Sequence, residues 1–161
     1  MSRIYYESPL GPIEIIGDEE CIHEVEFRKE AASDDDHVPQ NVLNAKQQLE
    51  EYFSGSRNTF DLQLKQTGTE FQQKVWNELC NIPFGETISY LELARRLGDQ
   101  KSIRAAGTAN GKNKIAIIVP CHRVIGSDGS LTGYAGGLDK KQWLLKHEGS
   151  LPGMEQMELF S

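Results

Sequence analysis

The stretch SYLELARRLGDQKSIRAAGTANG, residues 89–111, decides the fold of the second half of the chain. Ser89 precedes a short helix that Gly98 ends, and a second helix begins near Lys101 or Ser102. Two short helices joined by a tight turn with a glycine, the second helix basic and rich in small residues, are typical of a helix-turn-helix. An ordinary helical hairpin has the same pattern, so these residues alone leave both interpretations open.

The charge of the chain is divided along its length. The net charge is −7, yet residues 1–66 carry 6 Lys and Arg against 14 Asp and Glu, whereas residues 95–123 carry 7 against 1. A basic segment of this kind is the electrostatic footprint of a nucleic-acid site. A solvated helix face explains the charge equally well.

A candidate nucleophile stands at the end of the basic segment. Cys121 lies in VPCHRVIG, residues 119–126, where Pro120 restricts the backbone that presents the thiol. His122 is a candidate base, and Arg123 places positive charge close to a sulfur that must ionise in order to react. The alternative is a buried, unreactive cysteine.

The first 66 residues predict a small α/β domain. We expect strands at 3–7, 13–16 and 22–27, a mobile loop at 30–40 whose charges do no more than stay solvated, a helix at 41–53 and a strand at 60–64. No residue pattern in this domain resembles a catalytic motif.

From residue 67 the pattern changes to helices. Besides the pair in 89–111, we expect helices at 71–79 and 138–147, a short buried strand or extended segment at 115–119, and a glycine-rich loop at 126–137. The fold class is α+β, with domains at 1–66 and 67–150 and a flexible tail at 151–161.

The cysteines and the N-terminus indicate the compartment. Cys21, Cys80 and Cys121 are odd in number and widely spaced, which favours neither a disulfide framework nor a standard zinc site. The chain shows no signal peptide and no run of about 18 apolar residues. We expect a soluble, cytoplasmic protein without a membrane partner.

The segment PCHRV, residues 120–124, resembles the active-site signature of the O6-alkylguanine-DNA alkyltransferases, also called methylated-DNA-protein-cysteine methyltransferases. Further blocks fall at the family's spacing, namely 68–79, 82–94, 104–107, Asn113, 134–138 and 143–149. The N-terminal half is similar only in layout and in its opening SPLGP. The resemblance implies a ribonuclease H-like N-terminal domain and a winged-helix-like C-terminal domain with a helix-turn-helix.

The resemblance also implies a reaction. A member transfers the alkyl group irreversibly from O6 of guanine in duplex DNA, and from O4 of thymine, to its own cysteine after the nucleotide has rotated out of the stack. The protein would act once, as a monomer, in the cytoplasm or on the nucleoid, and without a cofactor. No zinc is expected, since among the zinc ligands of the human relative only His23 has an apparent counterpart.

Catalytic roles follow from the resemblance. Cys121 corresponds to the nucleophile, His122 to a base that acts through a water, and Glu148 to the carboxylate that orients the imidazole. Tyr90 corresponds to the tyrosine that donates to the purine ring, and Asn113 to a brace for the turn that carries the cysteine.

The resemblance likewise assigns DNA and substrate contacts. The expected DNA-binding residues are Arg104, which fills the vacated position, with Ala105, Ala106, Gly107, Thr108 and Arg123. The expected substrate pocket consists of Pro120, Val124, Tyr134, Ala135, whose N–H donates to O6, and Gly136.

Two other functions compete with repair. One is a lesion sensor or helix-turn-helix DNA-binding protein without chemistry, although the group of relatives that only bind lesions has tryptophan where this chain has Cys121. The other is a cysteine hydrolase that turns over repeatedly.

The tail holds a separate signal. In QMELF, Gln156, Leu159 and Phe160 resemble the short peptide with which bacterial DNA enzymes bind the replication sliding clamp. A chance match in an extended tail remains the alternative.

Overall fold

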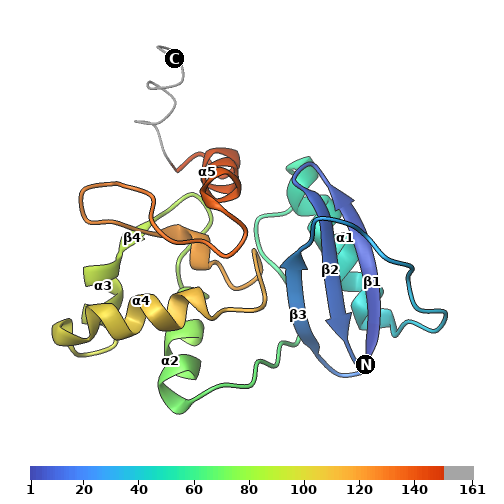
Figure 1. Ribbon diagram of the computed structural model, residues 1–161, viewed down its shortest axis with the longest axis horizontal. Helices are drawn as coiled ribbons and strands as arrows, with labels where there is room; N and C mark the ends of the chain where they lie inside the picture. The colour runs from blue at the N-terminus through green and yellow to red at the C-terminus, as the bar shows by residue number, and fades with distance from the viewer. Residues whose placement is uncertain (151–161) are drawn as a thin grey trace, which may run out of the picture. The chain divides into compact units, whose positions relative to one another are not determined.

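The computed structural model describes residues 1–150, which form two compact units (Figure 1). The first unit contains Met1–Gly68 together with Lys114–Ile118, and the second contains Thr69–Asn113 together with residues 119–150. The tail with the candidate clamp peptide lies outside the described residues. No helix in residues 1–150 combines the length and the apolar composition that crossing a membrane requires.

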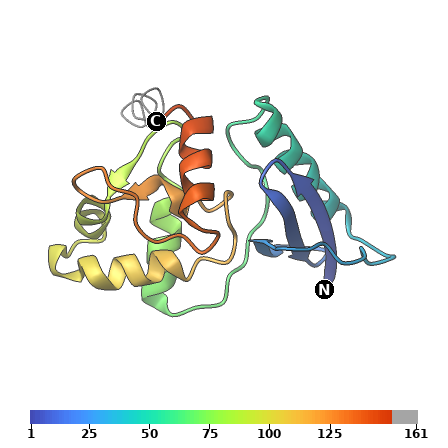
Figure 2. The ribbon, with the colours of Figure 1, turned by 45° about the horizontal axis from the view of Figure 1, so that its top comes forward.

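The first unit is built on a three-stranded antiparallel meander. Strands β1 (Ser2–Ser8), β2 (Gly11–Gly17) and β3 (Ile22–Phe27) lie in the order β1-β2-β3, as the alternating pattern predicts. Helix α1 (Gln40–Ser54) lies along the sheet and contacts β1 and β2 (Figure 2). Its buried side chains recur at helical spacing, which is why this segment is a helix: they are Val42, Ala45, Leu49, Tyr52 and Phe53.

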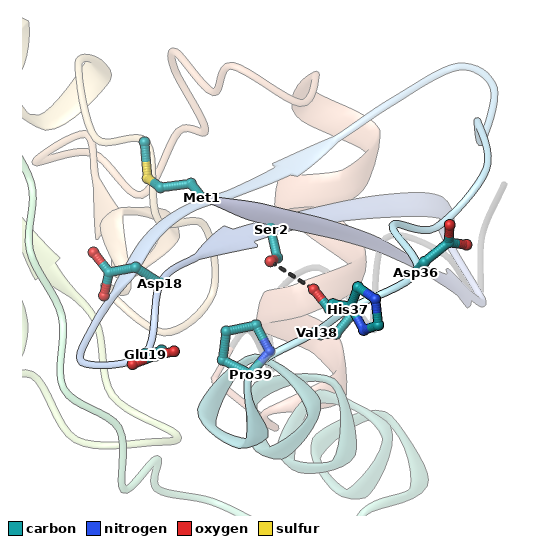
Figure 3. A pocket seen from close by; sticks show the side chains of 8 residues that line it. All are labelled: Met1, Ser2, Asp18, Glu19, Asp36, His37, Val38 and Pro39. Atoms are coloured by element: carbon teal, nitrogen blue, oxygen red, sulfur yellow. Dashed lines mark hydrogen bonds between the residues drawn. The ribbon is translucent and has the colours of Figure 1, made fainter.

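The acidic loop before α1 hydrogen-bonds to the edge of this sheet, and the expectation that its charges only stay solvated is wrong. The Asp34 carboxylate accepts a hydrogen bond from the N–H of Tyr5 at 2.9 Å, and the Asp35 carboxylate accepts one from the N–H of Arg3 at 2.9 Å. Both N–H groups belong to β1, an edge strand whose donors would otherwise lack partners. Farther along the loop, the carbonyl of His37 accepts a hydrogen bond from the Ser2 hydroxyl of β1. A hollow with both polar and apolar side chains lies beside this contact (Figure 3).

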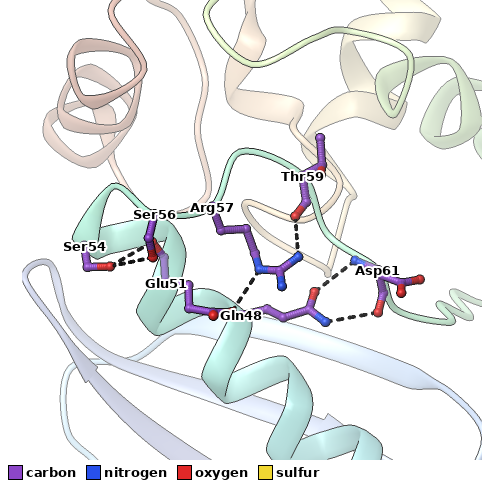
Figure 4. A network of polar contacts seen from close by, with 7 residues as sticks. All are labelled: Gln48, Glu51, Ser54, Ser56, Arg57, Thr59 and Asp61. Atoms are coloured by element: carbon purple, nitrogen blue, oxygen red, sulfur yellow. Dashed lines mark hydrogen bonds and ion pairs between the residues drawn. The ribbon is translucent and has the colours of Figure 1, made fainter.

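The strand expected at residues 60–64 does not form. Only Leu64 makes a bridge, to Ile22. Farther back, the side-chain amide of Gln48 both donates to and accepts from the backbone of Asp61, at 3.1 and 2.9 Å, as a neighbouring strand would (Figure 4). A side chain of α1 thus takes the place of a neighbouring strand. The sequence pattern of residues 60–64 could not predict this, because a local pattern does not show which partner lies alongside.

The apolar run at residues 115–119 is buried, as expected, but is not a strand. Ile115 makes one bridge, to Val25, and belongs to the first unit through it. The chain then turns, and Ile117 has a φ of 70°, which is rare for a β-branched residue.

The second unit contains the predicted helices, and their ends agree with the sequence signals. They are α2 (Glu70–Leu79), α3 (Tyr90–Arg96), α4 (Ile103–Gly111) and α5 (Leu138–His147), with 3-10 turns at Gln100–Ser102 and Cys121–Arg123. Two-residue strands β4 (Ile88–Ser89) and β5 (Val124–Ile125) pair in parallel. The Thr69 hydroxyl caps α2, and the Ser89 hydroxyl caps α3 by accepting from the N–H of Glu92 at 3.0 Å. Together, α3 and α4 form the helix-turn-helix.

The buried indole of Trp76 ties α2 to α4. Its Nε1–H donates to the carbonyl of Ala109 at 3.0 Å, so the tryptophan belongs to the core, as predicted. Ala106 and Ala109 are buried on the same side of α4. Small side chains there let α4 approach the rest of the unit closely.

Candidate active site

Cys121 opens a single 3-10 turn and is 7% exposed. Two side-chain amides brace this turn. Asn113 Nδ2 lies 2.9 Å from the carbonyl oxygen of Val119 and 3.3 Å from Cys121 Sγ, and Asn110 Nδ2 donates to the Cys121 carbonyl at 3.3 Å. The sulfur therefore sits on a backbone that two residues from the end of α4 hold in place. Asn113 was expected here, whereas Asn110 was missed.

His122, Arg123 and Glu148 form one buried network. His122 Nε2 lies 2.8 Å from Glu148 Oε2, and Arg123 donates to both oxygens of the same carboxylate, at 2.8 and 3.1 Å. A further guanidinium N–H of Arg123 donates to the carbonyl of Ile82 at 2.6 Å. The side chains of His122 and Glu148 are fully buried. A buried charge is costly unless it is paired, and the charges of Glu148 and Arg123 face each other in this network.

The Arg123 side chain lies inside the second unit, whereas we expected it at the DNA-binding surface. Its side chain is 7% exposed and its guanidinium is engaged by Glu148, so it has no surface to offer DNA. The sequence around Arg123 does not show whether its side chain contacts DNA or pairs with a carboxylate 25 positions away.

The network determines the protonation of its members. Burial alone would raise the pKa of Glu148, but the hydrogen bonds and charges of His122 and Arg123 outweigh it and hold the pKa at about 2. Burial lowers the pKa of His122 despite the carboxylate beside it. A neutral imidazole beside an ionised carboxylate carries its hydrogen on Nε2, which leaves the lone pair on Nδ1. Among residues 1–150, this buried Nδ1 has no hydrogen-bond partner, so it is free to accept a proton.

The thiol is protonated at rest. Burial raises the pKa of Cys121, and the hydrogen bond from Asn113 and the positive charge of Lys141 oppose that rise. A base is therefore needed to form the thiolate.

Lys141 is a buried residue of the site that the sequence analysis missed. Its side chain lies on α5, and its Nζ donates to the carbonyls of Val124, Thr132 and Gly133 at 2.7, 2.9 and 3.4 Å. Burial lowers the pKa of Lys141 to about 8. Lys141 stands three residues before Leu144 and four before Leu145, so it shares the apolar side of the helix with them. This spacing could have predicted its burial.

Tyr90 begins α3 beside the same lysine. Its hydroxyl donates to the carbonyl of Thr132 at 2.9 Å, and Lys141 Nζ lies 5.8 Å from the centre of its ring. Burial raises the pKa of Tyr90, so the hydroxyl keeps its proton and remains a donor. The glycine-rich loop is thus tied to α3 and α5 through the Thr132 carbonyl.

The expected pocket residues divide into buried and accessible ones. Pro120 and Val124 are buried on either side of the 3-10 turn, whereas Ala135 is exposed and Gly136 is partly exposed on the loop. Burial raises the pKa of Tyr134 well above its ordinary value, and negative charge on Cys121 and Glu148 adds to the rise. Tyr134 therefore stays neutral.

The expected DNA-binding residues of α4 lie on two different sides of the helix. Arg104, Ala105 and Thr108 are exposed, together with Lys101 and Lys112 at either end. Ala106 is fully buried, and Gly107 faces the Tyr90 ring, where a Cβ atom would lie 3.5 Å from Cδ1. We expected both small residues at DNA. Ala106 instead packs inside its own unit, whereas Gly107 is partly exposed beside the Tyr90 ring.

Comparison with known proteins agrees with this arrangement. The family model described as the ribonuclease-like domain of 6-O-methylguanine DNA methyltransferase matches residues 1–66, and the model of its DNA-binding domain matches residues 70–150. A methylated-DNA-protein-cysteine methyltransferase of Methanosarcina acetivorans is 52% identical over 150 residues, covering 90% of this chain and 96% of that protein. A constitutive enzyme of the same name from Bacillus subtilis is 44% identical, covering 88% of this chain and 92% of that protein.

Solved structures show the same fold. The crystal structure of Mycobacterium tuberculosis O6-methylguanine methyltransferase superposes with a TM-score of 0.83 at 42% identity, covering 93% of this chain and 94% of that one. The structure of the M. tuberculosis protein in complex with DNA gives 0.82 at 44% identity, covering 91% of each chain. The expected family and the α+β fold class are thereby confirmed: this chain belongs to the 6-O-methylguanine DNA methyltransferase family.

Proposed function

We propose that this chain repairs duplex DNA by direct reversal, in which Cys121 takes the alkyl group from O6 of guanine once and irreversibly. The observation that carries the proposal is the relay in the second unit. A protonated thiol lies on a braced turn, and the next residue presents an unpartnered imidazole nitrogen whose ring Glu148 orients. Family membership gives the reaction class, and the relay supplies what that reaction needs.

The transfer proceeds by displacement at the alkyl carbon. His122 Nδ1 takes the thiol proton through a bridging water, and the imidazolium that forms is stabilised by Glu148. The Cys121 thiolate then forms the S–C bond as the C–O bond breaks, and the electron pair of that bond moves onto the purine. The Tyr90 hydroxyl gives its proton to the ring and regains one at the expense of the His122 imidazolium, so the thiol proton ends on the base. The reaction leaves guanine, S-alkylcysteine and a neutral His122.

Two donors stabilise the leaving purine in this scheme. The Tyr90 hydroxyl, which donates to Thr132 in the free protein, exchanges that carbonyl for the purine ring. The backbone N–H of Ala135, on the exposed part of the loop, donates to O6. Donors placed where negative charge develops are the main electrostatic contribution to such a displacement.

The DNA contact is assigned to the exposed side of α4. The target base cannot reach a buried sulfur from within the duplex, so the nucleotide must rotate out of the stack. Arg104 occupies the position that the nucleotide leaves, Ala105 and Thr108 allow close approach, and Lys101 and Lys112 add phosphate affinity. Arg123 has no part in this contact, since its role is to hold Glu148.

Intact-mass measurement tests the reaction. After incubation with a duplex containing O6-methylguanine, the wild-type chain should gain one methyl group in place of a hydrogen on Cys121, and Cys121→Ser should gain nothing. A protein that binds the lesion without chemistry would show no gain with either chain, and a hydrolase would turn over with its cysteine unmodified. The same assay with O4-methylthymine tests the second substrate that we assign to the site.

The tail supplies a further proposed partner. We assign Gln156, Leu159 and Phe160 to a contact with the replication sliding clamp. The repair protein itself is proposed to be a cytoplasmic monomer. Titration with the clamp should show weaker binding for the Leu159→Ala/Phe160→Ala double variant than for the wild type. Equal binding by both chains would remove this partner without affecting the repair reaction.

A further inference from the structure

The exposed part of α4 carries an apolar side chain that the repair chemistry above does not use. Ile103, the first residue of α4, is 39% exposed between Lys101 and Arg104. An exposed isoleucine contributes little to folding here, because alanine is the better helix former and part of the side chain remains in water. Single exposed apolar residues are common, so the argument depends on where this one lies.

Ile103 lies on the side of α4 that faces Tyr90. It stands four residues before Gly107, and residues four apart share one side of a helix. A Cβ atom on Gly107 would contact the Tyr90 ring at 3.5 Å. Arg104 and Thr108, which are joined by a hydrogen bond from the threonine hydroxyl to the arginine carbonyl at 3.0 Å, point to a different side. Ile103 is therefore next to Arg104 in the sequence and displaced from it toward the candidate active site.

The charge around Ile103 indicates what it contacts. Arg104 is exposed on the first turn of α4, and Lys101 and Lys112 are exposed just before and just after this helix. A polyanion is attracted to this surface, whereas an apolar groove of another protein would have to desolvate three cations. A duplex offers phosphates for Lys101 and Lys112, a vacated stack position for Arg104 and base faces for the isoleucine.

We propose that Ile103 is a wedge residue that presses into the base stack beside the extruded nucleotide while Arg104 occupies the vacated position. The inference rests on the proposed function and adds a residue to its DNA contact. Proteins that bend DNA from the minor groove insert Leu, Ile, Met or Phe between base steps, and burial of the apolar side chain offsets part of the unstacking cost. The wedge would stabilise the extruded state and take no part in alkyl transfer.

Two substrates separate extrusion from chemistry. A duplex with one O6-methylguanine requires extrusion, whereas free O6-benzylguanine presents an activated alkyl carbon and requires none. The measured quantity is the ratio of the single-turnover rate constant on the duplex to that on the free base. We expect this ratio to fall about tenfold in Ile103→Ala, since a stabilised unstacked step is lost.

Matched variants complete the test. Ile103→Leu keeps the apolar volume and should stay within about twofold of the wild-type ratio. Leu43→Ala removes a side chain of similar exposure (43%) from α1 in the other unit and should keep that ratio. Thermal unfolding of each variant checks that all of them fold, which the exposure of both positions favours.

The outcomes distinguish the two levels of the argument. An Ile103→Ala ratio equal to that of Leu43→Ala overturns the wedge while leaving repair intact. A wild-type chain that takes alkyl groups from neither substrate overturns the proposed function itself. Fluorescence of 2-aminopurine placed beside the lesion, bound by the Cys121→Ser chain, should rise less when Ile103→Ala is added; an unchanged rise contradicts the wedge.

Discussion

At the scale of single residues, the candidate site depends on how one carboxylate is shared. Glu148 faces His122 with one oxygen and Arg123 with both. Arginine stays charged at every relevant pH, so it keeps Glu148 ionised whether or not His122 carries a second proton. The carboxylate can therefore stabilise the imidazolium that forms during proton transfer.

Replacing Arg123 tests this sharing. Arg123→Met leaves the Glu148 charge buried with one partner fewer, and removal of one member of a buried pair costs about 3–5 kcal/mol. We expect a loss of that order in the free energy of unfolding, measured with urea, and a slower alkyl transfer. Arg104→Met on the exposed side of α4 is the matched control and should lose transfer from duplex DNA while keeping its stability. Equal stability of the two variants would contradict the role assigned to Arg123.

The pH dependence of stability tests the state of Glu148. The pKa of its carboxyl is about 2 in the folded protein, against about 4.3 in an unfolded chain. A depressed carboxyl pKa contributes stability that is present above the unfolded value and is lost as the pH falls through the folded one. Urea unfolding should therefore show a loss on the order of 3 kcal/mol as the pH falls from about 5 to about 2. The pKa of Asp18 is also depressed, to about 2, so part of the acid loss should remain in Glu148→Gln, but the loss there should be clearly smaller than in the wild type. Glu50→Gln, a change on the exposed side of α1, should lose as much as the wild type; an equal loss in Glu148→Gln would argue against the assignment.

At the scale of elements, loops carry contacts that their composition conceals. The glycine-rich loop between β5 and α5 has two carbonyls bound by Lys141, and the acidic loop before α1 satisfies two donors of an edge strand. Both loops would be assigned as mobile from their glycine and aspartate content. In each, a charged side chain supplies the partner that a regular element would otherwise provide.

Lys141 should control the order of the glycine-rich loop. Lys141→Met removes the donor to the carbonyls of Val124, Thr132 and Gly133. We expect faster amide hydrogen exchange in residues 126–137 and a transfer rate reduced at least about tenfold, because the Tyr90 hydroxyl shares the Thr132 carbonyl. Lys74→Met on the exposed side of α2 should change neither quantity. Unaltered exchange in Lys141→Met would show that the loop is ordered by other contacts.

The acidic loop should protect the edge of the sheet. Asp34→Ala/Asp35→Ala removes both acceptors from β1, and we expect a loss of about 1–2 kcal/mol in the free energy of unfolding, since exposed hydrogen bonds contribute modestly. The bare edge should also raise self-association, seen by light scattering at high concentration. Asp36→Ala in the same loop is the control. Indistinguishable scattering and stability would mean that water serves the edge equally well.

At the scale of the whole molecule, an acidic protein binds DNA because its charge is unevenly distributed. Residues 1–66 carry a net charge of −8 and residues 95–123 one of +6. Affinity for a duplex depends on the cations that meet phosphates, and not on the sum over the chain. The net charge of −7 therefore has little bearing on whether DNA is the partner.

The salt dependence of binding tests this division. With the unreactive Cys121→Ser chain, the logarithm of the binding constant should fall linearly with the logarithm of the salt concentration. Lys112→Ala should reduce the slope by about 0.9, the value for one phosphate contact. Arg104→Ala should weaken binding to the lesion while leaving the slope nearly unchanged, since Arg104 fills the stack. Lys46→Ala in the first unit should have no effect; a slope that responds to it equally would place the contact elsewhere.

Local signals were sufficient for much of this molecule. Periodicity and caps located the four main helices of the second unit and α1, and alternation located the meander. The residues around Cys121 predicted a nucleophile and a base, and together with the further matching blocks they indicated the family. Such features depend on residues within a few positions of one another, so they can be predicted from the sequence alone.

Only the tertiary structure decided which distant groups meet. It showed that Arg123 pairs with Glu148, that Ala106 is buried while Gly107 lies against the Tyr90 ring, and that Lys141 is buried. Residues 60–64 make a single bridge where a strand was expected, and residues 115–119 make one where a buried strand or extended segment was expected. Each of these outcomes depends on a partner far away in the sequence. A hydrogen bond or an ion pair is specified by two groups, and one sequence position displays only one of them.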